Sequence, residues 1–366
     1  MSDLTQAKRP NFFAEKLEDY KKLTGREKGK MWGNFFLNNA LYFMIGLLVI
    51  YVTIQNPAFL GIRSLINMVR MSSAAMFMAL GIGGIIVLTG TDLSAGRALG
   101  LTAVISASLL QRSDLATRMF PNLPDVPIAL AIGVVLLLVV LVGCLIGLFN
   151  GFFVHKFSLH PFIVTLSTQM MLMGLILLYM NFGTNTGQPI SGLDPTYQNF
   201  VRGSVLSIAG QPIPNFVWFA ILAIIVMWFV WNKTVLGKNM YAVGANPEAA
   251  RVSGVNVGFT IITIFVIAGG LYGFAGFVES AHIGSNTANT GVEYELFAIA
   301  ACVIGGVSFT GGVGKISGIV TGVFMIQIIQ VALQWLSVNA AIQPIITGAI
   351  ILIAVSLDMQ KYLAKK

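Results

Sequence analysis

Long apolar segments alternate with short polar connections along most of this chain. Several of these segments carry a Gly or a polar interruption, so the predicted positions of their ends are approximate. A run of about 20 apolar residues is long enough to cross a bilayer as a helix. The pattern therefore predicts an all-α polytopic membrane protein with about ten transmembrane helices, near residues 36–55, 66–90, 93–110, 127–150, 161–181, 213–232, 258–280, 294–310, 316–335 and 341–357.

Composition supports this division. Of the 366 residues, 56% are hydrophobic and only 10% are charged, whereas a soluble domain carries about 25% charged residues. The pattern predicts a polar N-terminal extension at 1–34, a transmembrane domain at 35–358 and a C-terminal tail at 359–366. The extension mixes both charges and has no early apolar core, so we expect no signal peptide; an amphipathic surface helix is compatible with it.

Lys and Arg residues set the expected orientation. They are dense in both terminal tails, and cytoplasmic loops of membrane proteins carry an excess of such residues. Ten spans place both termini in the cytoplasm, together with Lys156, Lys233, Lys238, Arg251 and Lys315. The net charge of +8 is therefore interpreted as a sign of topology and not of nucleic-acid binding.

A short polar helix is predicted in the cytoplasmic loop at 233–257. Asn246 is a good N-cap, Pro247 suits the first helical position, and Glu248 places a negative charge at the positive end of the helix dipole. Gly254 can adopt the left-handed conformation that ends a helix. A capped helix over 247–253, between two membrane spans, indicates a contact with another protein.

A polar break interrupts the apolar pattern at the start of the third predicted span. Thr91, Asp92, Ser94 and Arg97 lie there, and charged residues near a bilayer are tolerated when they pair or face a wet cavity. Discontinuous helices line substrate sites in transporters. These four residues are candidates for the translocation pathway; the alternative is a loop near the cytoplasmic face that holds the fold together.

A second polar group flanks the outer ends of the seventh and eighth spans. Glu279, Asn286, Glu293 and Glu295 are candidates for contacts at the outer mouth, either to a sugar in transit or to a soluble partner, and solvated loop charges are the alternative. The outer connection at about 182–212 is either a simple connector or a docking loop for such a partner.

The spacing of the glycines indicates how the helices pack. Glycines four residues apart, such as Gly143, Gly147 and Gly151, allow helices to approach closely. Residues 82–90 and 302–318 share Ile-Gly-Gly and Thr-Gly, which hints at a duplicated bundle. We expect the two Cys residues to be packing residues.

The chain has no phosphate-binding loop for ATP and no clustered metal ligands or catalytic dyad, so an enzyme is not expected. An ion-coupled carrier is an alternative.

Three stretches carry a family resemblance. Residues 90–97 (GTDLSAGR), 246–258 (NPEAARVSGVNVG) and 298–314 (AIAACVIGGVSFTGGVG) resemble the branched-chain amino acid/monosaccharide class of bacterial ABC permeases, and its galactose/methyl-galactoside branch above all. Ribose permeases are similar too, with a shorter form of the first motif. The resemblance runs from about residue 36 to the end, and the N-terminal extension departs from it.

The resemblance implies a permease subunit of a sugar importer in the bacterial inner membrane, with a homodimer around the pathway. It implies an ABC ATPase subunit with two nucleotide-binding domains that binds ATP and Mg, with no cofactor in this chain, and a periplasmic sugar-binding protein. Glu248, Ala249, Ala250 and Gly254 match the E-A-A-x-x-x-G pattern of the coupling helix that docks on the ATPase. Glu248 is then expected to pair with a basic ATPase residue, and the two alanines to allow close contact.

Overall fold

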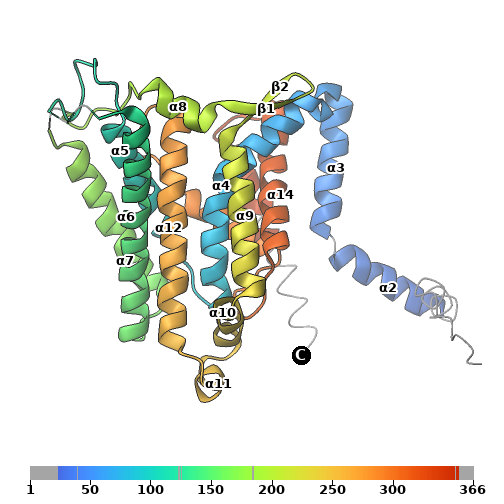
Figure 1. Cartoon of the computed structure of the whole chain (residues 1–366). Coiled ribbons are helices and arrows are strands. Elements are labelled where there is room, and N and C mark those ends of the chain that lie inside the picture. The colour runs from blue at the N-terminus through green and yellow to red at the C-terminus, as the bar shows by residue number, and fades with distance from the viewer. Residues whose placement is uncertain are drawn as a thin grey trace, which may run out of the picture.

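The chain folds into a bundle of helices that run side by side (Figure 1). The computed structural model describes residues 24–38, 40–122, 124, 126–183, 185–350 and 352–353. In chain order the elements are α2 (Gly25–Asn38), α3 (Ala40–Gln55), η1 (Pro57–Leu60), α4 (Ile62–Val87), α5 (Ala95–Leu109), α6 (Ile128–Lys156), α7 (Pro161–Met180), α8 (Pro195–Arg202), β1 (Ser204–Ile208), β2 (Gln211–Pro214), α9 (Asn215–Lys233), α10 (Val235–Ala245), α11 (Pro247–Val252), α12 (Val257–Ile283), α13 (Tyr294–Ile304) and α14 (Ile316–Trp335).

The two ends of the bundle carry different elements. α10 and α11 lie at one end, named here the α11 end, and α8 with the two strands lies at the other, named the hairpin end (Figure 1). Basic residues that terminate or connect helices gather at the α11 end, namely Lys156, Lys233, Lys238, Arg251 and Lys315. The structure therefore places on one end the residues that the positive-inside rule groups together.

Six helices of the described part are long and apolar enough to cross a membrane: α4, α6, α7, α9, α12 and α14. Residues 42–55 of α3, α5 and α13 form shorter apolar helices. The segment expected at 341–357 begins with a turn at 341–342 and is helical at 343–350 and 352–353, while residues 351 and 354–357 lie outside the described residues. The all-α membrane fold is confirmed, while the count of ten spans stays a prediction.

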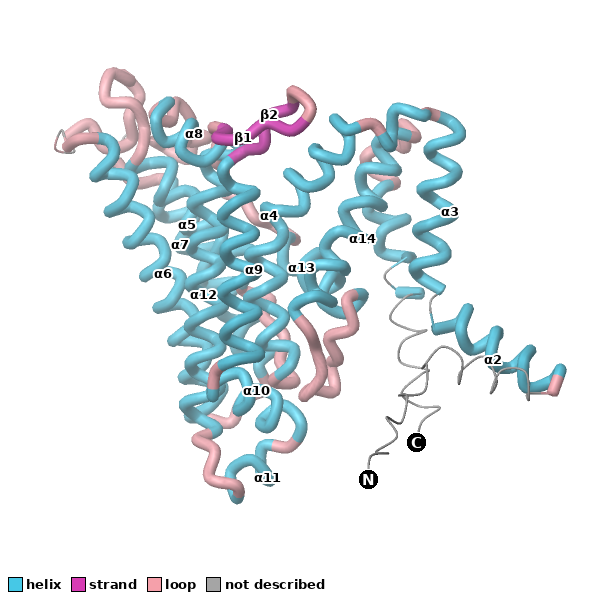
Figure 2. The backbone as a smooth tube through the Cα atoms, turned by 45° about the vertical axis from the view of Figure 1, so that its right-hand side comes forward, coloured by secondary structure: helices cyan, strands magenta, loops and turns pink. Residues whose placement is uncertain are grey.

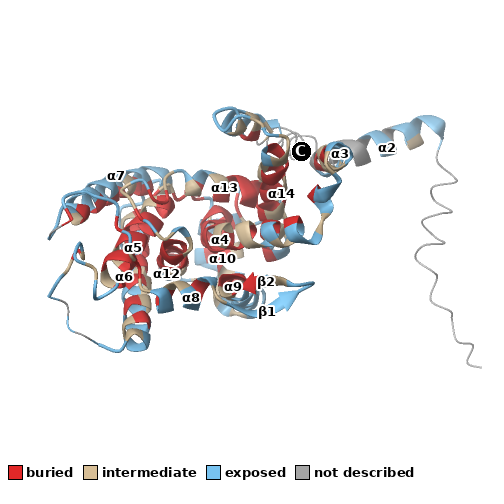
Figure 3. Ribbon diagram, turned by 90° about the horizontal axis from the view of Figure 1, so that it is seen from above, coloured by how far each residue is buried: buried red, intermediate tan, exposed pale blue. Residues whose placement is uncertain are grey.

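Burial separates a central layer from an outer one. α4, α12 and α14 bury more than half of the residues in their most apolar stretch, whereas α6, α7 and α9 bury fewer than a third (Figure 3). Exposed Leu, Ile and Phe side chains on the outer helices need an apolar surround, because a helix that is hydrophobic on all sides is stable only in a core or in lipid. The outer layer therefore faces the bilayer.

Glycines bring α6 and α12 into backbone contact. A Cβ atom built at Gly143 would overlap the carbonyl oxygen of Gly269, and one built at Gly269 would overlap that of Gly143. Gly147 meets the carbonyl of Phe265 in the same way, and Gly273 meets that of Val139. The packing role predicted from the four-residue spacing is confirmed for this pair.

The helix α13 begins inside the bundle. The segment 284–293 runs from the hairpin end along α5, because the carbonyl of Thr290 lies against Gly100 and that of Gly291 lies against Gly96. α13 therefore starts within the bundle, where it packs between α4 and α14 (Figure 2). Non-helical backbone at this depth is tolerated only where protein or a wet cavity surrounds it.

Two stretches are more ordered than the sequence pattern indicates. The connection expected at 182–212 contains α8 and an antiparallel hairpin in which Leu206 pairs with Ile213. Ala209 and Gly210 turn the chain with positive φ at both positions, as a two-residue hairpin turn of type I′ requires. The loop expected at 233–257 contains α10 as well as α11.

The terminal predictions are only partly covered by the structure. α2 extends away from the bundle beyond the end of α3, at a level above α10 and α11 (Figure 1). The predicted extension at 1–34 is described from residue 24 onward, where Met31 and Trp32 are exposed. Residues 1–23 and the predicted tail at 359–366 lie outside the described residues.

Candidate functional site

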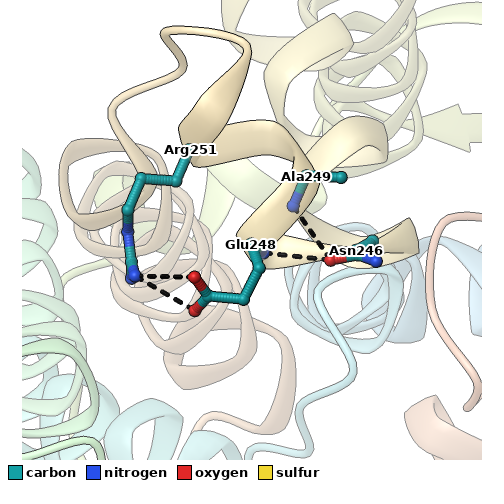
Figure 4. Close-up of polar contacts among 4 residues, drawn as sticks. All are labelled: Asn246, Glu248, Ala249 and Arg251. Atoms are coloured by element: carbon teal, nitrogen blue, oxygen red, sulfur yellow. Dashed lines mark hydrogen bonds and ion pairs between the residues drawn. The ribbon is translucent and has the colours of Figure 1, made fainter.

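α11 begins at an N-cap residue, Asn246. The Asn246 side chain accepts hydrogen bonds from the backbone N–H groups of Glu248 and Ala249, each at 3.0 Å (Figure 4). Pro247 occupies the first turn, where the missing N–H has no consequence. These contacts satisfy two of the four N–H groups that a helix start leaves unpaired. The predicted N-terminal cap is confirmed.

The end of α11 is a Schellman motif. Gly254 has φ of +84°; its N–H donates to the carbonyl of Arg251, and the N–H of Val255 donates to that of Ala250, both at 3.0 Å. A residue with a Cβ pays a conformational penalty in this left-handed region. The helix closes at Val252, one residue before the predicted end.

The two faces of α11 differ. Ala250 is only 5% exposed and packs with Val243 and Val257 of the neighbouring helices. The close contact with an ATPase that the two alanines are expected to allow stays a prediction. Glu248 and Arg251 form an exposed ion pair at 3.0 Å. Val252 is 90% exposed, which makes it the apolar tip of the element.

α10 ties α11 to the interior of the bundle. Gly244 of α10 lies so close to α4 that a Cβ would overlap the carbonyl of Val87. The same carbonyl accepts a hydrogen bond from the N–H of Gly312 at 2.9 Å, and the Tyr241 hydroxyl donates to the carbonyl of Gly314 at 2.9 Å. The two Gly-rich stretches noted in the sequence thus meet beneath α10. α11 is therefore connected through α10 to the ends of α4 and α13.

The polar break before α5 forms a buried hydrogen-bonded chain. Asp92 accepts from the N–H and the hydroxyl of Ser94 at 2.9 and 2.6 Å. Asn150 of α6 donates to the Ser94 hydroxyl at 2.9 Å and accepts from Thr168 of α7 at 2.6 Å. Asp92, Ser94, Asn150 and Thr168 are all at most 3% exposed. This chain joins α5, α6 and α7.

The other two residues of this candidate pathway lie nearby. Thr91 is half-buried, and its carbonyl accepts from the hydroxyl of Thr165 at 3.2 Å. Arg97 is half-buried and donates to the carbonyl of Ala288 at 2.9 Å. The geometry of Asp92 and Ser94 favours a role in holding the fold, while Arg97 borders the segment that descends into the bundle.

The four residues expected at the outer mouth are not together on one surface. Glu279, Asn286 and Glu295 are at most 5% exposed, whereas Glu293 is exposed with φ of +67°. Glu279 accepts a hydrogen bond from the Tyr294 hydroxyl at 2.8 Å. Glu295 lies beside Gly96, near the start of α5. Burial of three of these residues favours a role inside the bundle over contact with a soluble partner.

A cavity of about 230 Å³ opens between α4, α12, α13 and α14. Its polar lining is Glu279, His282, Tyr294, Gln327 and Gln330. Sequence reasoning noted the first of these and missed the two glutamines of α14. The available signal was their spacing within a predominantly apolar helix, since residues three apart share a helix face.

Comparison with known proteins identifies the family. Residues 64–355 match the family described as branched-chain amino acid transport system / permease component. The chain is 43% identical to the galactose/methyl galactoside import permease protein MglC of Escherichia coli, over 92% of this chain and 98% of that protein. It is 44% identical to the protein of that name from Salmonella typhimurium, over 89% and 95% of the two chains.

A more distant relative is the ribose import permease protein RbsC of Bacillus subtilis, 35% identical over 86% of this chain and 90% of that protein. No solved structure matches the chain significantly. The family match covers most of the sequence, including the polar break, α11 and the cavity lining. This membrane-spanning chain therefore belongs to the family of branched-chain amino acid transport system permease components.

Proposed function

We propose that this chain is the permease subunit of an ATP-driven importer of galactose and methyl galactoside. The observation that carries the proposal is the graded similarity to known permeases. Relatives named for galactose and methyl galactoside are 41–44% identical over nearly their whole length in three bacteria. Those named for ribose reach 32–35%. Ribose or another monosaccharide is the alternative substrate.

The geometry of α11 supports coupling to an ATPase. The helix is capped at both ends, projects from the bundle and is anchored on its inner face by Ala250. A rigid projecting element converts the movement of a partner into movement of the helices behind it. In this proposal the ATPase subunit, with two nucleotide-binding domains, binds ATP and Mg and meets the exposed face of α11.

The remaining parts of the assembly follow the same proposal. A periplasmic sugar-binding protein delivers the sugar at the hairpin end, and two permease copies form a homodimer in the inner membrane. Both termini then lie in the cytoplasm, on the side of α11. An ion-coupled carrier is the competing class; it would need no ATPase and would respond to ionophores.

The test is uptake of radiolabelled galactose, methyl galactoside and ribose in cells with and without the gene, together with copurification of an ATPase on the tagged chain. We expect deletion to abolish galactoside uptake alone and the tagged chain to retain an ATPase. Loss of ribose uptake instead would indicate that ribose is the substrate, and the chain would still be an importer subunit. Uptake that collapses with an ionophore, with no ATPase bound, would replace the importer by a carrier.

A further inference from the structure

Two glutamines of α14 face the cavity. Gln327 is 6% exposed, and its amide nitrogen donates to the thioether sulfur of Met71 at 3.7 Å. Sulfur of this kind is a weak acceptor. Gln330 lines the same space and is half-buried. A polar group in a membrane bundle is costly unless it finds strong partners. A ligand that offers hydroxyl groups supplies Gln327 with a better hydrogen bond than sulfur does.

Glu279 of α12 adds a carboxylate to the same wall. One of its oxygens accepts from the Tyr294 hydroxyl at 2.8 Å, and the other lies 3.5 Å from Nδ1 of His282. A carboxylate offers about four lone-pair positions, so these contacts leave acceptor capacity for further hydroxyl donors. Amide and carboxylate groups together can accept from and donate to several hydroxyls of one small molecule.

The rest of the cavity is apolar and partly aromatic. Met71, Met78, Phe297 and Ile326 complete the lining, with the ring of Tyr294. Ligand sites are commonly apolar pockets with a few convergent polar groups, and those for drug-sized ligands measure roughly 300–1,000 Å³. The smaller volume here, about 230 Å³, matches one monosaccharide. The C–H face of a pyranose ring fits against such a wall.

We propose that this cavity between α4, α12, α13 and α14, present once in each copy of the homodimer, holds the hexose during transit, with Gln327, Gln330 and Glu279 hydrogen-bonding its hydroxyl groups. The inference rests on the proposed function, since it names the place where the imported sugar is held. α13 links this cavity to the coupling element, because its far end leads into the Gly-rich stretch beneath α10. Movement of α11 therefore reaches the wall of the sugar site.

The experiment measures uptake of galactose and of singly deoxygenated galactoses that the wild type imports. The variants are Gln327→Leu, Gln330→Leu and the matched control Gln334→Leu, which lies one turn further along α14 with an exposed side chain. We expect each cavity variant to lower galactose uptake about five- to tenfold, as for a lost hydrogen bond, and the control to change little. The deficit relative to wild type should vanish for the sugar that lacks the contacted hydroxyl.

Membrane abundance and ATPase copurification are measured for every variant, and Gln327→Met, close in shape to glutamine, replaces Gln327→Leu if the latter does not accumulate. An equal deficit for galactose and all its deoxy forms indicates a structural role and overturns the inference. So does galactose uptake in the cavity variants that equals the control. Absence of galactose uptake in the wild type defeats the proposed function itself, which separates the two failures.

Discussion

The oxygen of the Asn246 side chain accepts both hydrogen bonds that start α11. Replacing such a cap with Ala costs about 1 kcal/mol of helix stability, while Asp caps about as well as Asn. We therefore expect Asn246→Ala to raise hydrogen exchange in α11 and lower sugar uptake, and Asn246→Asp to keep both near wild type. Unchanged exchange at the amides of Glu248 and Ala249 in the Ala variant would contradict the cap.

The exposed tip of α11 makes a second prediction at the residue scale. Val252 is 90% exposed, and Val205 on the hairpin, at the opposite end, is 87% exposed. A charge placed in an apolar contact is costly when it is desolvated without a partner. Val252→Glu should reduce ATPase copurification and uptake several-fold, whereas Val205→Glu should leave copurification intact. Equal loss in both variants would mean that Val252 does not mark the ATPase side.

Among elements, the contact of α6 with α12 depends on glycine. A methyl group at Gly269 would overlap a backbone carbonyl of α6, whereas Gly174 of α7 has open space around it. Overpacking of this kind typically costs about 1–3 kcal/mol. Gly269→Ala should therefore lower the thermal stability of the purified protein in detergent, and Gly174→Ala should leave it equal or slightly raised, because Ala favours a helix over Gly. Equal midpoints in the two variants would refute the close contact.

Features set by residues close together in the chain could be predicted from the sequence, whereas features set by contacts between distant segments could not. The caps at Asn246 and Gly254 and the glycine spacing on α6 act within a few residues, and the sequence alone indicated them correctly. The predicted span at 294–310 begins where α13 begins, at Tyr294, but no local pattern showed that the polar segment 284–293 is held inside the bundle by α5, a contact far away in the chain. α10 was missed because Gly237 and Gly244, poor helix formers, are there for close packing against neighbouring elements.

The candidate site shows the same division. Asp92 and Ser94 stood out as polar residues in an apolar run, yet Asn150, which donates to Ser94, lies on α6, so no local pattern could show that they are buried in a network. Gln327 and Gln330 become candidate binding residues only because α12 and α13 complete the cavity that they line. The sequence shows which polar side chains are present, but whether they are buried or accessible depends on which helices pack together.

At the scale of the whole molecule, the separation of basic residues between the two ends predicts the orientation in the membrane. The α11 end holds Lys156, Lys233, Lys238, Arg251 and Lys315, and this excess is expected on the cytoplasmic side. The test uses single cysteines at Val252 and Val205 in a chain whose Cys144 and Cys302 are replaced with Ala. With a membrane-impermeant maleimide, right-side-out vesicles should label Val205→Cys alone, and inside-out vesicles Val252→Cys alone. The reverse pattern would put α11 outside the cell, out of reach of ATP, and would remove the basis for coupling through α11.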